Sequence, residues 1–207
     1  MQNIGAVILA AGGSSRFGQP KQLLQFRGKT LIRTIIDAAF EAGCSPVVVV
    51  IGSNAETIHC EVAHTNVLEV RNTNWQRGIG SSIRSGLQAL TDHAPDVQAI
   101  LLLVCDQPTV TALFIERLIA THEATKKNIV ASTYANTVGV PALFDRSFFK
   151  ELLALGDEAG AKSIILQNPE RVAQFAFSEG AIDIDTWEDW KELNERSHSE
   201  RSEGSHT

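Results

Sequence analysis

Apolar residues recur along the chain with two spacings that alternate. Continuous apolar runs of five to seven residues, bounded by glycine, proline or polar residues, are typical of strands buried on both faces of a parallel sheet. Between these runs, apolar residues recur every three to four positions, which predicts amphipathic helices. The runs predict strands at residues 4–10, 46–51 and 99–104, and segments with some polar residues or of shorter length are expected to form strands at 66–70, 129–133 and 142–144.

The helical spacing is supported by residues that begin or end helices. Thr30 and Thr111 stand directly before helical patterns and are expected to cap them, and Gly43 follows the first pattern as a stop signal. Thr186, with Asp189 three residues later, is a weak capping box before the last pattern. The predicted helices span residues 31–42, 55–62, 81–90, 112–125, 147–155, 161–166 and 187–195.

Strands that alternate with helices predict an α/β fold, with a single doubly wound, mostly parallel sheet flanked by helices. At 207 residues the chain suits one domain, which we expect at residues 1–196. Residues 197–207 lack apolar anchors and are expected to form a flexible tail. Ligands of such sheets bind beyond the carboxyl ends of strands, so a site is expected at the loops after Ala10 and Val104.

Composition and charge narrow the function classes. No apolar run reaches the roughly 18 residues of a membrane-spanning helix, and the N-terminus has no basic region before its apolar stretch, so a cytoplasmic protein is expected. The net charge of −6 argues against a general nucleic-acid or anionic-membrane binder. The charge is uneven, because residues 1–36 hold five basic and no acidic side chains. This imbalance predicts an anionic ligand near the first loop.

The first loop carries the strongest chemical signal, the sequence LAAGGSSRFGQPKQLL from Leu9 to Leu24. Glycines allow successive backbone N–H groups to face a polyphosphate, and Arg16 and Lys21 add the positive charge that amides lack. The lysine lacks the Walker A spacing and the following Ser or Thr, and the Rossmann pattern G-x-G-x-x-G is absent. The loop therefore predicts a triphosphate cradle of another type, with an ordinary glycine-rich turn as the alternative.

Asp106 follows a predicted strand and is a hard oxygen ligand suited to Mg²⁺. This ion typically takes one or two protein carboxylates and completes its shell with phosphates and waters. Asp183 or Asp185 could supply the second carboxylate, and the residues alone do not choose between them. The three cysteines are too few for a disulfide framework and are expected to be reduced.

Several motifs resemble those of one enzyme family. The pattern L-A-A-G-x-S-x-R-x-G followed by K-x-L resembles the signature of nucleotidyltransferases with a GT-A-like Rossmannoid fold. Further segments, in the same order, resemble the molybdenum-cofactor cytidylyltransferase branch of the MobA-like nucleotidyltransferases. They are GIGSSI with GL at 78–87, CDQP at 105–108, GVPALF at 139–144, GDEAGA at 156–161 and DIDT at 183–186. The resemblance covers roughly residues 4–192.

The resemblance implies a Mg²⁺-dependent enzyme that moves CMP from CTP onto molybdopterin, a phosphorylated pterin, and releases pyrophosphate. It implies Lys21, Arg16 and Asp106 as catalytic residues, with metal ligands at Asp106 and at Asp183 or Asp185. A molybdoenzyme that receives the product is the implied protein partner. The implied nucleotide-binding residues are Leu9, Ala10, Ala11, Gly12, Gly13, Ser14, Ser15, Arg16, Lys21, Gly78, Gly80, Ser81 and Ser82, and the implied acceptor-binding residues are Gly139, Pro141, Asp157 and Gly160.

Three residues depart from the family pattern. Val140 stands where a polar residue is common in a loop that faces the pterin, Lys162 where arginine is common, and Trp187 where proline is common. The first two leave the acceptor open, whereas the first turn of a helix accepts residues other than proline. Two alternatives follow. One is a nucleotidyltransferase for another small phosphorylated acceptor. The other is a non-enzymatic cofactor-binding chaperone, which would not need Lys21 and Asp106 together.

Overall fold

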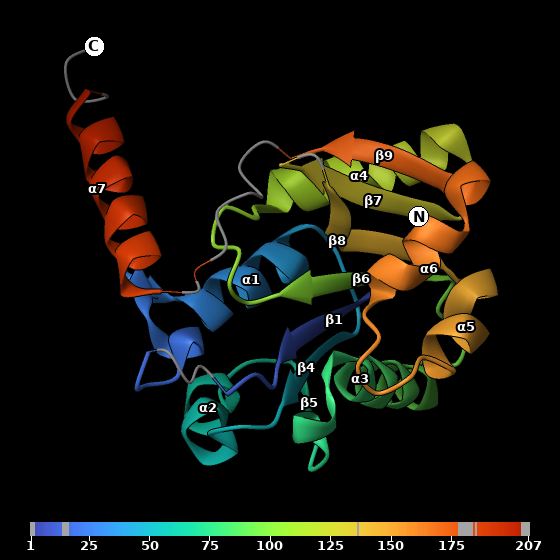
Figure 1. Ribbon diagram of the computed structural model, residues 1–207, viewed down its shortest axis with the longest axis horizontal. Helices are drawn as coiled ribbons and strands as arrows, with labels where there is room; N and C mark the ends of the chain where they lie inside the picture. Colours follow the sequence, from blue (N-terminus) through green and yellow to red (C-terminus); the bar gives the residue numbers. More distant parts are fainter. Residues whose placement is uncertain (1–2, 14–16, 136, 178–183, 185, 204–207) are drawn as a thin grey trace.

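A seven-stranded sheet runs through the centre of the molecule (Figure 1). The computed structural model describes residues 3–13, 17–135, 137–177, 184 and 186–203, with side chains described as far as Glu195. The strand order is β5-β4-β1-β6-β8-β7-β9. The strands are β1 (Ile4–Ala10), β4 (Val47–Ile51), β5 (Leu68–Arg71), β6 (Ala99–Val104), β7 (Ile129–Tyr134), β8 (Thr137–Asp145) and β9 (Val172–Ala176), and β2 (Gln25–Phe26) and β3 (Lys29–Thr30) form a separate hairpin.

The sheet is parallel except at β8, which runs antiparallel to both of its neighbours, β6 and β7. The predicted class, an α/β fold with a mostly parallel sheet, is therefore confirmed. Because β8 is reversed, its N-terminal end lies at the same edge of the sheet as the carboxyl ends of β1 and β6. This edge brings together loops that are far apart in the sequence.

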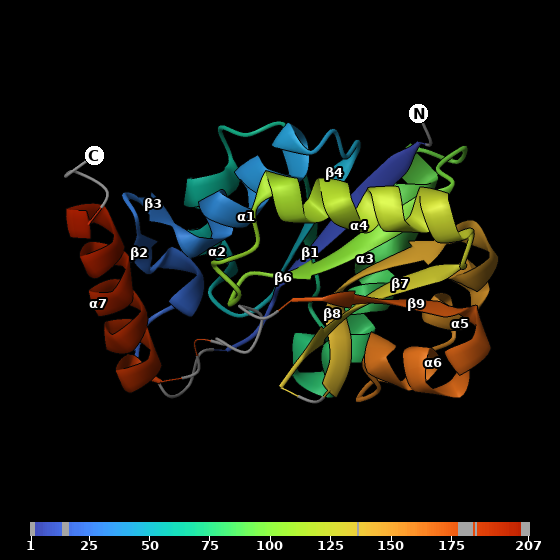
Figure 2. The same cartoon turned by 90° about the horizontal axis from the view of Figure 1, so that it is seen from above.

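Helices cover both faces of the sheet (Figure 2). One face packs against α1, α2 and α4, and the other packs against α3, α5 and α6. None of the described helices has the length and hydrophobicity needed to cross a lipid bilayer. The helices are α1 (Leu31–Glu41), α2 (Ala55–Val62), α3 (Ile79–His93), α4 (Ala112–Thr125), α5 (Phe149–Leu153), α6 (Ala161–Gln167) and α7 (Trp187–Glu203), with short 3₁₀ turns η1 (Lys21–Leu23), η2 (Trp75–Arg77), η3 (Arg146–Phe148) and η4 (Pro169–Arg171).

The first strand shows why its sequence is a continuous apolar run. All seven residues of β1 are buried. Ile4, Ala6 and Ile8 belong to the core on the α1 and α4 face, whereas Val7 and Leu9 belong to the core on the α3 face. Successive side chains of a strand point to opposite faces, so a strand covered on both sides has no position for a polar residue.

The predicted helix caps are formed. The Thr30 side chain accepts a hydrogen bond from the Arg33 N–H, and the Thr111 side chain accepts one from the Phe114 N–H. At α7 the capping box is reciprocal, because Asp189 N–H donates to Thr186 Oγ1 over 3.2 Å and Thr186 N–H donates to Asp189 Oδ2 over 2.7 Å. These bonds satisfy N–H groups that have no partner inside the helix.

The structure differs from the predictions at β8 and β9. β8 spans nine residues instead of three, because the pairing with β7 continues across a bulge. Ala131 pairs with Ala142 but Ser132 pairs with Gly139, so two residues of β8 stand outside the ladder. One of them is Pro141, which lacks the N–H that a ladder position requires. β9 lies at the sheet edge, and its partly exposed, alternating side chains did not predict a buried strand.

A third cluster of buried residues lies outside the main sheet. Phe17, Leu24, Phe26 and Leu31 pack with Ile184 and Leu193, and the rings of Phe17 and Trp187 lie 5.3 Å apart. In Figures 1 and 2 the last helix, α7, stands beside the β2–β3 hairpin and away from the central sheet. α7 continues to Glu203, past its predicted end near residue 195. The predicted boundary at residue 196 therefore falls within a helix, and the flexible tail expected at residues 197–207 stays a prediction.

Candidate functional site

The carboxyl ends of β1 and β6 lie side by side, and a cavity of about 360 Å³ opens beyond them. We call it the strand-end cavity. Of the residues that the sequence assigned to the nucleotide or to catalysis, its lining contains Leu9, Ala11, Gly12, Gly13, Lys21, Gly78, Ser82 and Asp106. The lining also contains residues that the sequence did not assign: Gln22, Trp75, Gln76, Ile79, Val104 and Cys105. The two loops singled out in the sequence therefore meet at one site.

Other predicted residues lie around this cavity or beyond the described chain. Ala10, Gly80 and Ser81 are buried behind the lining. Ser14, Ser15, Arg16, Asp183 and Asp185 lie outside the residues that the structure describes, so their assignments stay predictions.

Lys21 and Asp106 form an ion pair at the cavity. Lys21 Nζ lies 2.7 Å from Asp106 Oδ2, and the two side chains are 15% and 24% exposed. Lys21 Nζ also donates to the backbone oxygen of Ile184 over 3.3 Å, and the Ile184 N–H donates to the backbone oxygen of Asp106 over 3.2 Å. Three segments that are distant in the sequence thus converge on the ammonium group. The partial burial restricts water, which strengthens electrostatic interactions at this point.

Gln22 fixes the path of the first loop. Its side chain is buried, and Nε2 donates to the Ala10 oxygen over 2.9 Å and to the Gly12 oxygen over 3.0 Å. A primary amide has two N–H donors, so one side chain bonds the carbonyl at the end of β1 and a carbonyl of the loop that follows it. This role of Gln22 was not predicted, because its only signal in the sequence is a polar residue directly after Lys21.

The first turn of α3 forms the opposite wall of the cavity. Asn72 is buried, and its Nδ2 donates to the hydroxyls of Ser81 and Ser82 over 2.8 and 3.0 Å. The Ser81 hydroxyl in turn donates to the Gly78 oxygen over 2.8 Å. Gly78 has φ +129°, a conformation that favours glycine. This network orients the start of α3 toward the cavity.

The predicted acceptor residue Asp157 is engaged by two arginines. Its carboxylate lies 2.8 Å from Arg77 Nε and also accepts from Arg84. The hydrogen bond from Arg84 is the main reason that the pKa of Asp157 is lowered, and the charge of Arg77 adds to it. Arg84 also donates to the backbone oxygen of Leu155, and the Gly80 N–H donates to the backbone oxygen of Asp157 over 2.8 Å. These contacts anchor the loop at residues 156–160 to the start of α3.

The predicted acceptor residues Gly139 and Pro141 lie at the β8 bulge. The Val140 oxygen between them accepts from Tyr134 Oη over 3.2 Å and from Gln107 Nε2 over 3.5 Å. Gln107 directly follows Asp106, so the bulge lies next to the strand-end cavity. Bulges are common beside active sites, where they redirect the chain.

The donor set at Asp106 fits a Mg²⁺ ion. Its carboxylate lines the cavity and offers hard oxygen ligands beside the predicted position of the nucleotide phosphates. Within the described ranges, no cluster of three metal-ligating side chains is present. Asp183 and Asp185 directly flank Ile184, whose backbone contacts both Lys21 and Asp106. A site with one or two carboxylates completed by phosphates and water is typical of Mg²⁺.

Cys105 is buried against the same site, and burial raises the pKa of its thiol to about 12. The thiol is therefore protonated near neutral pH. The reactive form of cysteine is the thiolate, so these surroundings disfavour reaction of Cys105 near neutral pH. All three cysteines are unpaired, as predicted.

The fold and the site define an α/β protein with a cavity at the strand ends that combines a glycine-rich loop, a lysine and a carboxylate. The chain belongs to the MobA-like NTP transferase domain family, which matches residues 6–172. It is therefore a member of a nucleotidyltransferase family.

The chain is similar over nearly its whole length to proteins with different named activities. Nicotine blue oxidoreductase of Paenarthrobacter nicotinovorans is 29% identical, covering 89% of this chain and 93% of the relative. Molybdenum cofactor cytidylyltransferase of Escherichia coli is 24% identical, covering 95% and 98%. The crystal structure of Rv0371c from Mycobacterium tuberculosis is 32% identical with a TM-score of 0.78, covering 94% and 98%. A complex of Rv0371c with manganese has a TM-score of 0.75 at 29% identity, covering 94% and 99%.

Proposed function

We propose that this protein transfers CMP from CTP to molybdopterin, with Mg²⁺ as the metal, and releases pyrophosphate. The family match supports nucleotidyl transfer, and the likeness to the cytidylyltransferase supports the choice of CTP and of a phosphorylated pterin. The manganese complex of Rv0371c supports a divalent metal. The proposal includes a cytoplasmic enzyme that hands its product to a molybdoenzyme and has no nucleic-acid or membrane partner.

The observation that carries the proposal is the Lys21–Asp106 pair in the strand-end cavity. Nucleotidyl transfer depends on positioning of the phosphates and on neutralisation of their charge, because the attacking acceptor phosphate is already anionic. A binding protein needs the phosphate cradle but gains little from a lysine and a carboxylate at the same point.

The residues have separate roles in this proposal. An oxygen of the acceptor phosphate attacks the α-phosphorus, and the bond from that phosphorus to the β-phosphate oxygen breaks as pyrophosphate leaves. Lys21 stabilises the charge that develops at the α-phosphate, and Arg16 holds the leaving phosphates. Asp106 holds Mg²⁺, which when bound neutralises the nucleotide phosphates. The backbone from Leu9 to Gly12 and the start of α3 hold the base and ribose.

The test is steady-state pyrophosphate release by Lys21→Ala and Asp106→Ala across a range of Mg²⁺ and Mn²⁺ concentrations. Loss of Lys21 is expected to lower kcat roughly 10²–10³-fold at every metal concentration, as for removal of one preorganised electrostatic donor. Loss of Asp106 is expected to weaken metal affinity, so higher metal concentration recovers part of the rate. Lys29→Ala is the matched control, because Lys29 is an exposed lysine paired with Asp37 outside the cavity.

Circular dichroism confirms that each variant is folded. Near-normal turnover of folded Lys21→Ala or Asp106→Ala across the titration would overturn the role given to that residue. If both retain turnover, the cavity is a binding site and the cofactor-chaperone alternative takes precedence.

The substrates are tested by measuring pyrophosphate release for each nucleotide with molybdopterin, with other phosphorylated acceptors and with no acceptor. Release that needs CTP and molybdopterin supports the proposal, whereas release with a sugar or polyol phosphate supports the alternative acceptor. A parallel assay with nicotine blue tests the activity named for the Paenarthrobacter relative. Turnover of nicotine blue without pyrophosphate release from any nucleotide would contradict nucleotidyl transfer.

A further inference from the structure

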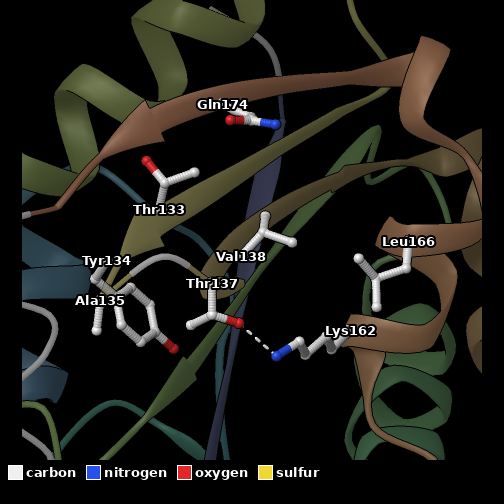
Figure 3. Close-up of a pocket in the computed structure, with 8 residues that line it drawn as sticks. All are labelled: Thr133, Tyr134, Ala135, Thr137, Val138, Lys162, Leu166 and Gln174. Carbon is white, nitrogen blue, oxygen red and sulfur yellow. Dashed lines mark hydrogen bonds between the residues drawn. The ribbon is translucent and has the colours of Figure 1, made fainter.

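A second, larger cavity of about 780 Å³ opens at the tip of the β7–β8 hairpin, and we call it the hairpin pocket. Figure 3 shows side chains from β7, β8, β9 and α6 around it. Its size lies within the range of small-molecule sites, which is roughly 300–1,000 Å³. Its lining includes Tyr134, Thr137, Val138, Lys162 and Leu166.

The pocket holds a positive charge that no described acidic residue neutralises. Lys162 points from α6 toward the start of β8, and its Nζ donates to Thr137 Oγ1 (Figure 3). Among the described residues, no carboxylate lies within salt-bridge distance of this ammonium group, whereas Lys21 and Lys29 each have one. An ammonium has three donors, so two remain for a ligand beside the hydroxyl of Thr137.

The pocket also holds apolar surface. Leu166 lies one turn further along α6 and is 60% exposed, although leucine is usually buried. Val138 and the ring of Tyr134 line the same space. A cation beside exposed aliphatic and aromatic surface fits an organic anion with an apolar body better than it fits inorganic phosphate.

One peptide group lies between residues that border the hairpin pocket and the strand-end cavity. The Val140 oxygen accepts from Tyr134, which lines the hairpin pocket, and from Gln107, which follows Asp106 of the strand-end cavity. Gly139 leaves room for this arrangement, because a Cβ at that position would lie 3.1 Å from Tyr134 Oη. A ligand that moves Tyr134 therefore acts on a carbonyl that the side chain of Gln107, the residue after Asp106, also contacts.

We propose that the hairpin pocket is a second ligand site, which binds an organic anion with an apolar body and holds its negative group at Lys162. Such a ligand is either the distal part of the acceptor, a reading that rests on the proposed transferase function, or a separate effector. Both sources share this chemistry and differ in their effect on turnover.

The first experiment measures binding alone, so it is independent of transfer activity. The probe is 1-naphthyl phosphate, with 1-naphthol as its neutral counterpart, measured by calorimetry with CTP and Mg²⁺ present to occupy the strand-end cavity. Lys162→Met is expected to weaken naphthyl phosphate binding on the order of tenfold and to leave naphthol binding unchanged, because a charge-assisted hydrogen bond is lost. Leu166→Asn is expected to weaken both probes.

Lys150→Met is the matched control, since Lys150 is exposed on α5 and lines neither cavity. Both Lys162 and Leu166 are exposed, so their variants are expected to fold, as judged by circular dichroism. Equal binding of naphthyl phosphate by wild type, Lys162→Met and Lys150→Met would overturn the proposal, as would no binding to wild type at millimolar concentration.

The second experiment distinguishes the two sources. A rise in acceptor KM in Lys162→Met, with the KM for CTP unchanged, identifies the pocket as part of the acceptor site. A change in wild-type turnover with naphthyl phosphate that is not relieved by more acceptor, and that Lys162→Met abolishes, identifies an effector site. If no nucleotidyl transfer is found with any acceptor, the proposed function fails, and the binding experiment alone decides whether the hairpin pocket is a ligand site.

Discussion

The contact between α3 and the loop at residues 156–160 makes Gly80→Ala an informative substitution. A Cβ at Gly80 would lie 2.0 Å from the Gly156 oxygen, 2.8 Å from the Ala159 oxygen and 3.0 Å from the Asp157 oxygen. All three are backbone atoms, so no side-chain rotation relieves the clash. Because a carbon and a carbonyl oxygen rarely approach within 3.0 Å, the loop has to move by about 1 Å.

The cost follows from what that movement breaks. The added methyl overpacks a closed contact, which typically costs about 1–3 kcal/mol. The hydrogen bond from the Gly80 N–H to the Asp157 oxygen contributes about 1 kcal/mol more. The ion pairs of Asp157 with Arg77 and Arg84 are partly exposed and add little. We therefore expect a loss of about 3 kcal/mol, which lowers Tm by roughly 6–12 °C in a chain of this length.

The assay is thermal unfolding followed by circular dichroism, together with CTP affinity measured by calorimetry. Affinity is expected to fall as well, because Gly78, Ile79 and Ser82 at the same helix start line the strand-end cavity. Gly156→Ala is the matched control, since a Cβ there meets nothing within 4 Å, and its Tm is expected to stay within about 2 °C. A Gly80→Ala protein that melts within 2 °C of wild type would refute the packing argument.

Three other predictions concern the nucleotide, the C-terminal residues and the thiols. We expect calorimetry to show tighter binding of CTP with Mg²⁺ than of GTP. Related guanylyltransferases usually carry glycine at the position of Ala11, whose methyl group lines the strand-end cavity and would crowd a purine; equal or tighter GTP binding contradicts this. Removal of residues 197–207 is expected to leave turnover and Tm nearly unchanged, and a fall in Tm of more than about 4 °C would show that this segment stabilises the fold. At pH 8, iodoacetamide is expected to modify the exposed Cys60 in the folded protein but not Cys44 or Cys105, because burial raises the pKa of those two thiols to about 12. Label found by mass spectrometry on either buried cysteine contradicts this.

The parts of the fold that the sequence predicted well depend on local patterns. The bounds of β1, β6 and α2 match the apolar runs and the helical spacing, because burial on fixed faces dictates those residues directly. β9 was missed because an edge strand is only partly buried and takes polar residues. The length of β8 was missed because its bulge is visible only in the pairing with β7.

In the site, too, local patterns predicted some residues, whereas contacts formed only on folding were missed. The resemblance and the strand ends predicted Lys21 and Asp106, and the structure brings them together. The roles of Gln22 and Asn72 were not predicted, since their amide donors act on groups that meet only in the folded chain. The loop anchored by Asp157 was assigned to the acceptor, although its carboxylate is occupied by two arginines whose positions no local pattern reveals.

The third cluster of buried residues has a consequence for synthesis of the chain. Ile184, whose backbone oxygen contacts the Lys21 ammonium, is translated 163 residues after that lysine. The strands β1, β4 and β6, which support the glycine-rich loop after Ala10, leave the ribosome much earlier. A nascent chain can therefore form most of the sheet while Phe17, Leu24 and Phe26 still lack their partners from α7. Under the proposed function, the surroundings of Lys21 are therefore completed only after Ile184 and Leu193 have emerged and packed, later than the central strands.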